Sequence, residues 1–320
     1  MRTPFTELVG CRVPIQLAGM GGVVTPELAA AVTNAGGLGM IGVPMLPAEV
    51  VASLLERIAK LAQGPFGATF LMPFLDREAL EVAASRARVV ELFFGDPDAA
   101  IVDAIHRGGA LASWQVGSCD EAVAAERAGC DLIVAQCAAA GGHVRGTIGL
   151  MPLLSQVLDS VRVPVLAAGG IATARDVAGA LATGAAGVRI GTRFLAAAET
   201  DMHPTYLAAL FAARAEDTVL TTAYSVGWPD APHRVLRSAV AAAEALDAPI
   251  AGETPIGPTR MPIPRFGVYP PIGSTTGRVD AMALYAGESV GAVKLVQPAA
   301  EILRELAEGA DRILGAQRGA

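Results

Sequence analysis

The clearest candidate for chemistry in this sequence is a histidine inside a glycine-rich loop. His143 ends the stretch Ala140-Gly141-Gly142-His143, just beyond an apolar run that begins at Leu132. An imidazole titrates near neutrality, so it can take a proton or hydrogen-bond a bound anion. The flanking glycines permit unusual backbone angles and let a ligand approach closely. We predict that His143 is catalytic; the alternative is a loop histidine that bonds only to backbone.

Two further glycine loops have the composition of an anion site. One contains Ala168-Gly169-Gly170 and precedes a helix signal at Thr173, and the other contains Gly191-Thr192 after the next apolar run. Backbone N–H groups in such loops can approach an anion, and a helix N-terminus adds a favourable dipole. The two loops predict a phosphate-binding site, with ordinary tight turns as the alternative. Nucleotides, flavins and sugar phosphates all remain open at this point.

The sequence offers little for metal or thiol chemistry. It has no H-E-x-x-H motif, no carboxylate cluster at ligand spacing and no G-x-S-x-G motif, so we expect no metal. The four cysteines are not spaced as C-x-x-C, which predicts reduced thiols. Cys137 precedes the His143 loop and could act as a nucleophile with that base. We favour a small buried apolar role for it.

A repeated strand–helix unit can bring these loops together. Three helical segments show a capping residue and, 11 positions later, a glycine stop: Thr25 to Gly36, Ser118 to Gly129, and Thr173 to Gly184. Short apolar runs that predict strands start near Ile15, Leu38, Phe66, Val89, Leu111, Leu132, Val163 and Val188. Eight such units in about 200 residues predict an α/β fold, a (β/α)8 TIM barrel, with a doubly wound sheet as the competitor. In barrels the phosphate site commonly follows strands seven and eight, and chemistry occurs at the carboxyl ends of the strands.

The composition changes after Arg214. Nine of the 21 prolines lie between Pro229 and Pro271, which does not suit a regular barrel segment. We predict a barrel over 1–215 and a smaller inserted lid domain over 216–275, which begins with some helix and ends in an extended proline-rich loop. Residues 276–320 should be C-terminal helices that return to the barrel, over Val279 to Gly291 and Pro298 to Leu314.

The overall composition excludes several classes of protein. The chain has 320 residues, 52% of them hydrophobic and 17% charged, so it can bury a large core. Its net charge is −7 and it shows no basic patch, so we expect no nucleic-acid partner. No apolar run reaches the roughly 18 residues of a membrane span, and the N-terminus lacks the apolar stretch of a signal peptide. We expect a cytoplasmic protein without a membrane partner.

Taken together, the motifs resemble the nitronate monooxygenase family, formerly called 2-nitropropane dioxygenases, which are FMN-dependent barrels. The resemblance covers most of the chain. It is carried by Pro14-Ile15-Gln16, Gly19-Met20-Gly21-Gly22, Ala35-Gly36-Gly37-Leu38-Gly39, Ala140-Gly141-Gly142-His143, Ala168-Gly169-Gly170-Ile171, Gly191-Thr192-Arg193-Phe194, Gly227-Trp228-Pro229, Arg234-Val235-Leu236-Arg237 and Tyr285-Ala286-Gly287-Glu288-Ser289-Val290-Gly291.

The resemblance implies FMN as the cofactor and a role for each matching residue. The backbone of Ala18, Gly19 and Met20 would lie against the isoalloxazine ring, and His143 would sit over the flavin beside the substrate. The substrate candidates are Tyr285 and Ser289. The remaining cofactor contacts would come from Thr69, Gln115, Gln136, Gly141, Gly142, Ala168, Gly169, Gly170, Gly191 and Thr192, the last four of these at the phosphate.

The chain departs from the family pattern at three positions. Thr69 stands where the family often has Asn, and a threonine is shorter and lacks the amide. Gln115 stands where some members carry Lys, and a neutral side chain stabilises negative charge near the flavin less well. Ala139 replaces a Glu that usually precedes the Gly-Gly-His motif.

Three functions follow from the resemblance. The first is FMN-dependent oxidation of alkyl nitronates by O2 to a carbonyl compound and nitrite, extending to neutral nitroalkanes if His143 acts as a base. The second is an NAD(P)H-dependent reductase of enoyl thioesters or quinones, because a flavin-dependent enoyl-acyl-carrier-protein reductase shares the Gly-Gly-His loop and both phosphate loops. The third is a non-catalytic FMN-binding barrel. We favour the first, with a small molecule and O2 as partners and a homodimer left open.

Overall fold

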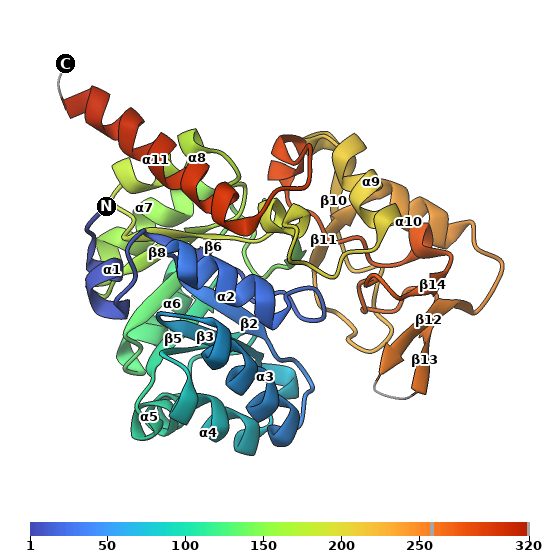
Figure 1. Cartoon of the computed structure of the whole chain (residues 1–320), viewed down its shortest axis with the longest axis horizontal. Helices are drawn as coiled ribbons and strands as arrows, with labels where there is room; N and C mark the ends of the chain where they lie inside the picture. The colour runs from blue at the N-terminus through green and yellow to red at the C-terminus, as the bar shows by residue number, and fades with distance from the viewer. Residues whose placement is uncertain (257–258, 319–320) are drawn as a thin grey trace.

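The eight apolar runs form one parallel sheet that closes on itself (Figure 1). The computed structural model describes residues 1–256 and 259–318. A parallel bridge between Gln16 and Leu38 joins the first barrel strand to the second, and this closes the barrel. The predicted TIM barrel is therefore confirmed. In spatial order the strands are β1 (Ile15–Leu17), β9 (Gly187–Ile190), β8 (Val165–Ala168), β6 (Leu132–Gln136), β5 (Leu111–Val116), β4 (Val89–Phe93), β3 (Phe66–Leu71) and β2 (Gly39–Gly42).

Side chains alternate between the two faces of the barrel wall, as period-two strands require. On β4, Val90 and Leu92 pack outward in the large core between sheet and helices, whereas Val89 belongs to a separate inner cluster. That inner cluster includes Phe5 of α1 (Pro4–Val9), so the N-terminal helix fills the amino end of the barrel. The outer helices are α2 (Pro26–Ala35), α3 (Ala48–Leu61), α4 (Arg77–Arg86), α5 (Ala99–Gly108), α6 (Cys119–Arg127), α7 (Leu150–Ser160) and α8 (Ala174–Ala182).

The predicted capping residues begin their helices. Thr25, Ser118 and Thr173 each accept a hydrogen bond from a backbone N–H of the first turn. The glycines predicted as stops lie at or just after the helix ends with positive φ angles, which L-residues rarely adopt: Gly36, Gly129 and Gly184.

The last helix of the chain completes the barrel. After β9, the chain leaves the barrel and returns as α11 (Ala299–Arg318), which packs against α8 and α2. Ile302 and Leu303 of this helix join the core between sheet and helices. Helix α11 thus occupies the place of the eighth barrel helix.

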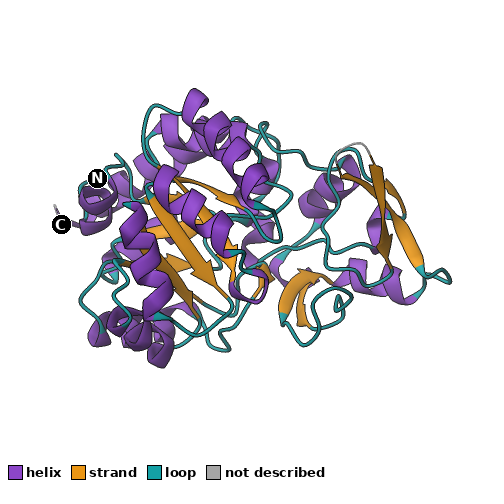
Figure 2. Cartoon of the chain, turned by 90° about the horizontal axis from the view of Figure 1, so that it is seen from below, coloured by secondary structure: helices purple, strands orange, loops and turns teal. Residues whose placement is uncertain are grey.

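The intervening residues, together with β7 from the connection between β6 and α7, form two small antiparallel sheets beside the barrel (Figure 2). One sheet has the order β10-β11-β7 and the other β13-β12-β14. Helices α9 (Pro204–Ala212) and α10 (Arg237–Glu244) lie with them. The strands are β7 (Gly142–His143), β10 (Thr218–Thr221), β11 (His233–Leu236), β12 (Ile250–Ile256), β13 (Thr259–Pro264) and β14 (Thr276–Gly277), and short 3-10 helices occur at η1 (Met72–Phe74), η2 (Thr192–Ala196), η3 (Ala215–Asp217), η4 (Val279–Ala281) and η5 (Glu288–Ala292).

Two local predictions were wrong. Part of the proline-rich stretch is a strand, because Pro262 and Pro264 lie on β13, an edge strand, where proline needs no inward N–H. The helix predicted from Val279 to Gly291 is instead two 3-10 helices around an extended segment. In that segment Tyr285 bridges to Val235 of β11, and this pairing replaces helical hydrogen bonds.

Within residues 1–256 and 259–318, no helix is both long and apolar enough to cross a bilayer. Over the same residues, no group of three or more His, Cys, Asp or Glu side chains is arranged to hold a metal ion.

Candidate active site

His143 lies where the barrel meets the smaller sheets. It belongs to β7, in the connection between β6 and α7, at the carboxyl end of the barrel strands, which we call the mouth. Strand β7 pairs antiparallel with β11, so that His143 stands opposite His233 and Gly142 opposite Arg234. The Gly142 φ angle of 74° lets the chain turn into this pairing. The loop that carries His143, which we call the His143 loop, is therefore held by a strand of the inserted region.

Aromatic rings surround the imidazole of His143. The ring stacks on Trp228 with centroids 4.0 Å apart and faces the edges of Phe94 and His233 at 5.9 and 5.4 Å. Tyr285 lies tilted at 5.6 Å. We call Phe94, Trp228, His233 and Tyr285 the aromatic wall. Phe94 has a φ of 64°, an uncommon value for a non-glycine residue and one that often marks functional sites.

The aromatic wall keeps His143 neutral. Burial, and to a smaller extent the nearby His233, lowers the pKa of His143 to about 3. Its Nε2 atom is buried and has no hydrogen-bond partner among the described residues. At neutral pH this ring is an uncharged base with a free nitrogen.

His233 is different, because both of its nitrogens are occupied. Its Nδ1 lies 2.8 Å from the carbonyl of Ala231, and its Nε2 accepts from the backbone N–H of Tyr224 at 3.2 Å. This pattern places the proton on Nδ1. His233 therefore shapes the wall and is not free to transfer a proton.

The glycine loops meet one another at the mouth. A β-carbon on Gly169 would lie 2.7 Å from the Cys137 sulfur, and one on Gly141 would lie 2.7 Å from the Ala286 carbonyl carbon. The Gly287 N–H donates to the Thr192 hydroxyl at 3.0 Å. The His143 loop, the two expected phosphate loops and the segment around Tyr285 (residues 282–287), which we call the Tyr285 segment, therefore form one packed unit.

The first loop of the barrel adjoins this unit. A β-carbon on Gly191 would lie 3.3 Å from the Ala18 β-carbon and 3.4 Å from the Met20 sulfur, and one on Gly19 would lie 2.7 Å from the Thr69 β-carbon. Ala18, Gly19, Met20, Thr69 and Gly191, which the resemblance assigns to the cofactor, are thus neighbours.

Polar atoms without partners lie at the same end of the barrel. Gln115 and Gln136 are buried, and in each the Oε1 atom has no hydrogen-bond partner among the described residues. The Gln136 amide donates to the His143 carbonyl at 3.2 Å, so this side chain helps to hold the His143 loop. Buried polar atoms normally find partners in protein, water or ligand. Together with the glycine loops, they fit a ligand that has both a hydrogen-bonding ring and a phosphate, as FMN has.

A charged network inside the barrel was missed by the sequence reasoning. Glu91 on β4 is fully buried, and its carboxylate accepts from Gln16 Nε2 at 2.8 Å, Thr69 Oγ1 at 3.2 Å and Arg189 Nη2 at 2.8 Å. The sequence did contain a signal, because Glu91 and Arg189 each lie within an apolar strand. Buried charges almost always have partners, so these two residues could have been expected to pair.

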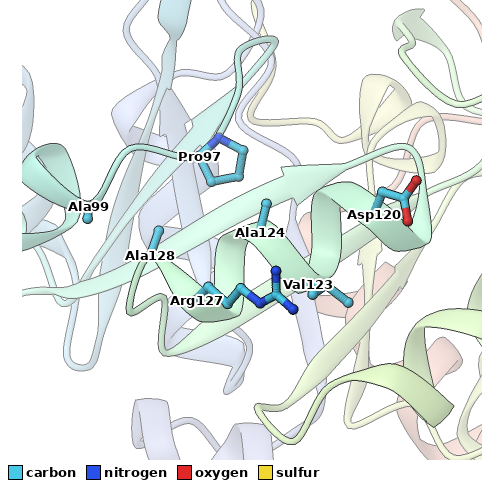
Figure 3. Close-up of a pocket in the computed structure, with 7 residues that line it drawn as sticks. All are labelled: Pro97, Ala99, Asp120, Val123, Ala124, Arg127 and Ala128. Atoms are coloured by element: carbon cyan, nitrogen blue, oxygen red, sulfur yellow. The ribbon is translucent and has the colours of Figure 1, made fainter.

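The structure gives less support for a chemical role of Cys137, Tyr285 and Ser289. Burial raises the pKa of the Cys137 thiol, which supports the apolar role and not a nucleophile. The Tyr285 hydroxyl donates to the Val268 carbonyl at 2.8 Å, and Ser289 lies half-buried in η5, after the Tyr285 segment. An open hollow of about 600 Å³ on the outer surface, between α6 and the start of α5, contains none of the predicted site residues (Figure 3).

The family model described as nitronate monooxygenase matches residues 2–81 and 75–309. A probable nitronate monooxygenase from Staphylococcus aureus is 30% identical over 268 residues, covering 69% of this chain and 75% of the relative. A (3aS,4S,5R,7aS)-5-hydroxy-7a-methyl-1-oxo-octahydro-1H-indene-4-carboxyl-CoA dehydrogenase from Mycobacterium tuberculosis is 32% identical over 242 residues, covering 74% and 67%.

Two solved structures are similar over nearly their whole length. FabK from Thermotoga maritima superposes with a TM-score of 0.83 at 28% identity, covering 100% of this chain and 99% of that one. The nitroalkane oxidase from Streptomyces ansochromogenes superposes with a TM-score of 0.79 at 27% identity, covering 98% and 100%.

Proposed function

The chain belongs to the nitronate monooxygenase family, and we propose that it oxidises alkyl nitronates with FMN and O2 to a carbonyl compound and nitrite. One observation carries the proposal. A neutral His143 with a free, buried Nε2 lies among aromatic rings at the same mouth as the two glycine loops. The nitronate monooxygenase and nitroalkane oxidase relatives support this choice of substrate class.

The residues of this chain supply binding and proton chemistry. Gly169, Gly170, Gly191 and Thr192 would hold the phosphate of FMN through backbone N–H groups and a hydroxyl. Gln115, Gln136 and Thr69 would hold the ring, with Ala18 to Met20 against its face. FMN, when bound, supplies the redox chemistry between substrate and oxygen.

His143 acts on the substrate as a base or a hydrogen-bonding group. A ring whose pKa is lowered to about 3 does not hold a permanent positive charge for a nitronate anion at neutral pH. Because the ring is neutral, its lone pair can accept the proton α to the nitro group of a neutral nitroalkane, although the burial that keeps it neutral also makes it a weaker base than a free imidazole. We therefore propose that the enzyme accepts nitroalkanes as well as nitronates, and that the aromatic wall excludes water around the reacting carbon.

Nitrite release tests this function. Purified FMN-loaded protein should release nitrite from an alkyl nitronate and from its nitroalkane in the presence of O2. His143→Asn should lower the nitroalkane rate about 10²- to 10⁴-fold, the usual range for loss of a general base. His106→Asn is the matched control, since His106 lies on α5 and is bonded to Asp131, and this variant should keep the wild-type rate. Unchanged turnover in His143→Asn would remove the central assignment.

The second candidate is an NAD(P)H-dependent reductase, and the indene-4-carboxyl-CoA dehydrogenase relative, named for redox chemistry on a coenzyme A thioester, favours it. Anaerobic addition of NADH, then NADPH, to the flavin-loaded protein distinguishes the two functions. Rapid bleaching of the flavin would support the reductase, whereas an unbleached flavin that nonetheless yields nitrite supports the monooxygenase. If the purified protein shows no flavin absorbance band, the result would favour a barrel that catalyses neither reaction.

A further inference from the structure

The Glu91 carboxylate fixes three side chains at once inside the barrel. It accepts hydrogen bonds from Gln16, Thr69 and Arg189, each on a different strand. Glu91 is fully buried and Arg189 is 8% exposed, so this ion pair is largely shielded from water. Each of the two carboxylate oxygens accepts from at least one donor, and one of the three donors is a cation.

The hydrogen bonds to Glu91 determine which atoms of Thr69, Gln16 and Arg189 can still donate or accept a bond. The Thr69 hydroxyl has one hydrogen and gives it to Glu91, so its oxygen can only accept a further bond. The Gln16 amide nitrogen gives one of its two hydrogens to Glu91, and the Gln16 Oε1 has no partner among the described residues. The Nε atom of Arg189 is a buried donor, and it also has no hydrogen-bond partner among the described residues.

The network reaches the proposed cofactor site through Thr69. The closeness of Gly19 to Thr69, with no room for a β-carbon between them, places the Ala18–Met20 loop directly against this side chain. Arg189 stands in register with Ala168 of β8 and lies two residues before Gly191, so the ion pair borders the loops that would hold the phosphate.

We propose that Glu91 and Arg189 are positioning residues of the cofactor site. Glu91 presents the Thr69 oxygen to the flavin as a pure acceptor, and the ion pair sets the charge that the flavin experiences from inside the barrel. This inference rests on the proposed function, because it requires flavin at the mouth. Gln115 is neutral, so Arg189 is the cation that would stabilise a reduced, negatively charged ring, and Glu91 limits that effect.

The reduction potential of the bound flavin provides a readout that a merely structural role would not move. Glu91→Gln leaves the Arg189 cation uncompensated and should raise the midpoint potential. Arg189→Gln leaves the Glu91 anion and should lower it, and the double variant should return close to wild type. Ser113→Ala is the matched control, because Ser113 lies in register with Glu91 and is buried but uncharged; it should leave the potential unchanged.

A second pair of variants covers the case in which the single charge changes prevent folding. Thr69→Val removes the acceptor and should weaken FMN binding roughly tenfold, whereas Thr69→Ser keeps the hydroxyl and should bind as wild type does. Equal potentials in the charge variants, or equal FMN affinity in Thr69→Val and Thr69→Ser, would overturn the inference. Wild-type protein that binds no flavin would instead overturn the proposed function.

Discussion

At the scale of single residues, His143 owes its protonation state to its surroundings. Stacking on Trp228 and burial among rings keep the imidazole neutral, whereas the Nδ1 proton of His233 is held by a backbone carbonyl. The sequence predicted the position of His143, because glycines and a barrel strand end are local signals. It could not predict the aromatic wall, since Phe94, Trp228 and Tyr285 come from three distant segments.

The lowered pKa of His143 has a consequence for stability. Between pH 6.5 and about pH 3 the unfolded chain binds a proton at this residue and the folded protein does not. The free energy of unfolding should therefore fall as the pH decreases through this window, by at most about 1.4 kcal/mol per pH unit for one histidine. Denaturant unfolding of the flavin-free protein at pH 7, 6, 5 and 4 measures it. His143→Gln should show a smaller slope, and parallel curves for the two proteins would contradict the assignment.

At the scale of elements, Arg234 on β11 connects the His143 loop to the inserted sheets. Its guanidinium donates twice to the Ala138 carbonyl at 3.0 and 2.9 Å, once to the Thr218 hydroxyl at 3.1 Å, and pairs with Glu288 at 3.1 Å. These contacts could not be predicted from the sequence, because Ala138 and Arg234 are 96 residues apart. The barrel helices were predictable from their caps, whereas the strand and the 3-10 turns of the inserted region depend on long-range pairing.

Removing this guanidinium should loosen the loop that carries His143. Arg234→Ala leaves the Ala138 carbonyl without its donors and should cost about 2–4 kcal/mol of stability, with a 10- to 100-fold lower kcat/KM. Arg234→Lys should not restore either, because an ammonium cannot reproduce the planar set of donors. Arg312→Ala is the control: Arg312 is 74% exposed, and its loss should change stability by less than about 0.5 kcal/mol. Equal stability and equal kcat/KM in the Arg234 and Arg312 variants would show that the Arg234 contacts do not hold the His143 loop.

At the scale of the whole molecule, the proposed cofactor site is assembled from nearly every part of the chain. Loops after β1, β6, β8 and β9 converge with Thr69 of β3 and with the Tyr285 segment, so a ligand there should stabilise the entire fold. The barrel could be predicted because the strand–helix unit repeats along the sequence, and both the spacing and the number of these units can be read without knowing any long-range contact. The buried Glu91–Arg189 pair was not, because each partner taken alone is an ordinary charged residue in an apolar run.

Removal of FMN tests this convergence. At a free FMN concentration 100 times its Kd, the free energy of unfolding should rise by about 2.7 kcal/mol above that of the flavin-free protein. Riboflavin lacks the phosphate and should stabilise less at the same concentration, if the paired glycine loops bind as proposed. Thermal or denaturant unfolding with each ligand makes the comparison, and equal stabilisation by both would argue against a phosphate site in those loops.

The position of α11 at the seam of the barrel also fixes the order in which the molecule can be completed on the ribosome. Strand β9 ends at Ile190, but the helix that covers the groove between α2 and α8 begins at Ala299. At roughly 5–20 residues per second, translation of the segment between them takes on the order of 5–20 seconds. For that interval the nascent barrel exposes the apolar surface that Ile302 and Leu303 later cover. The inserted sheets are therefore synthesised before the barrel they adjoin is sealed.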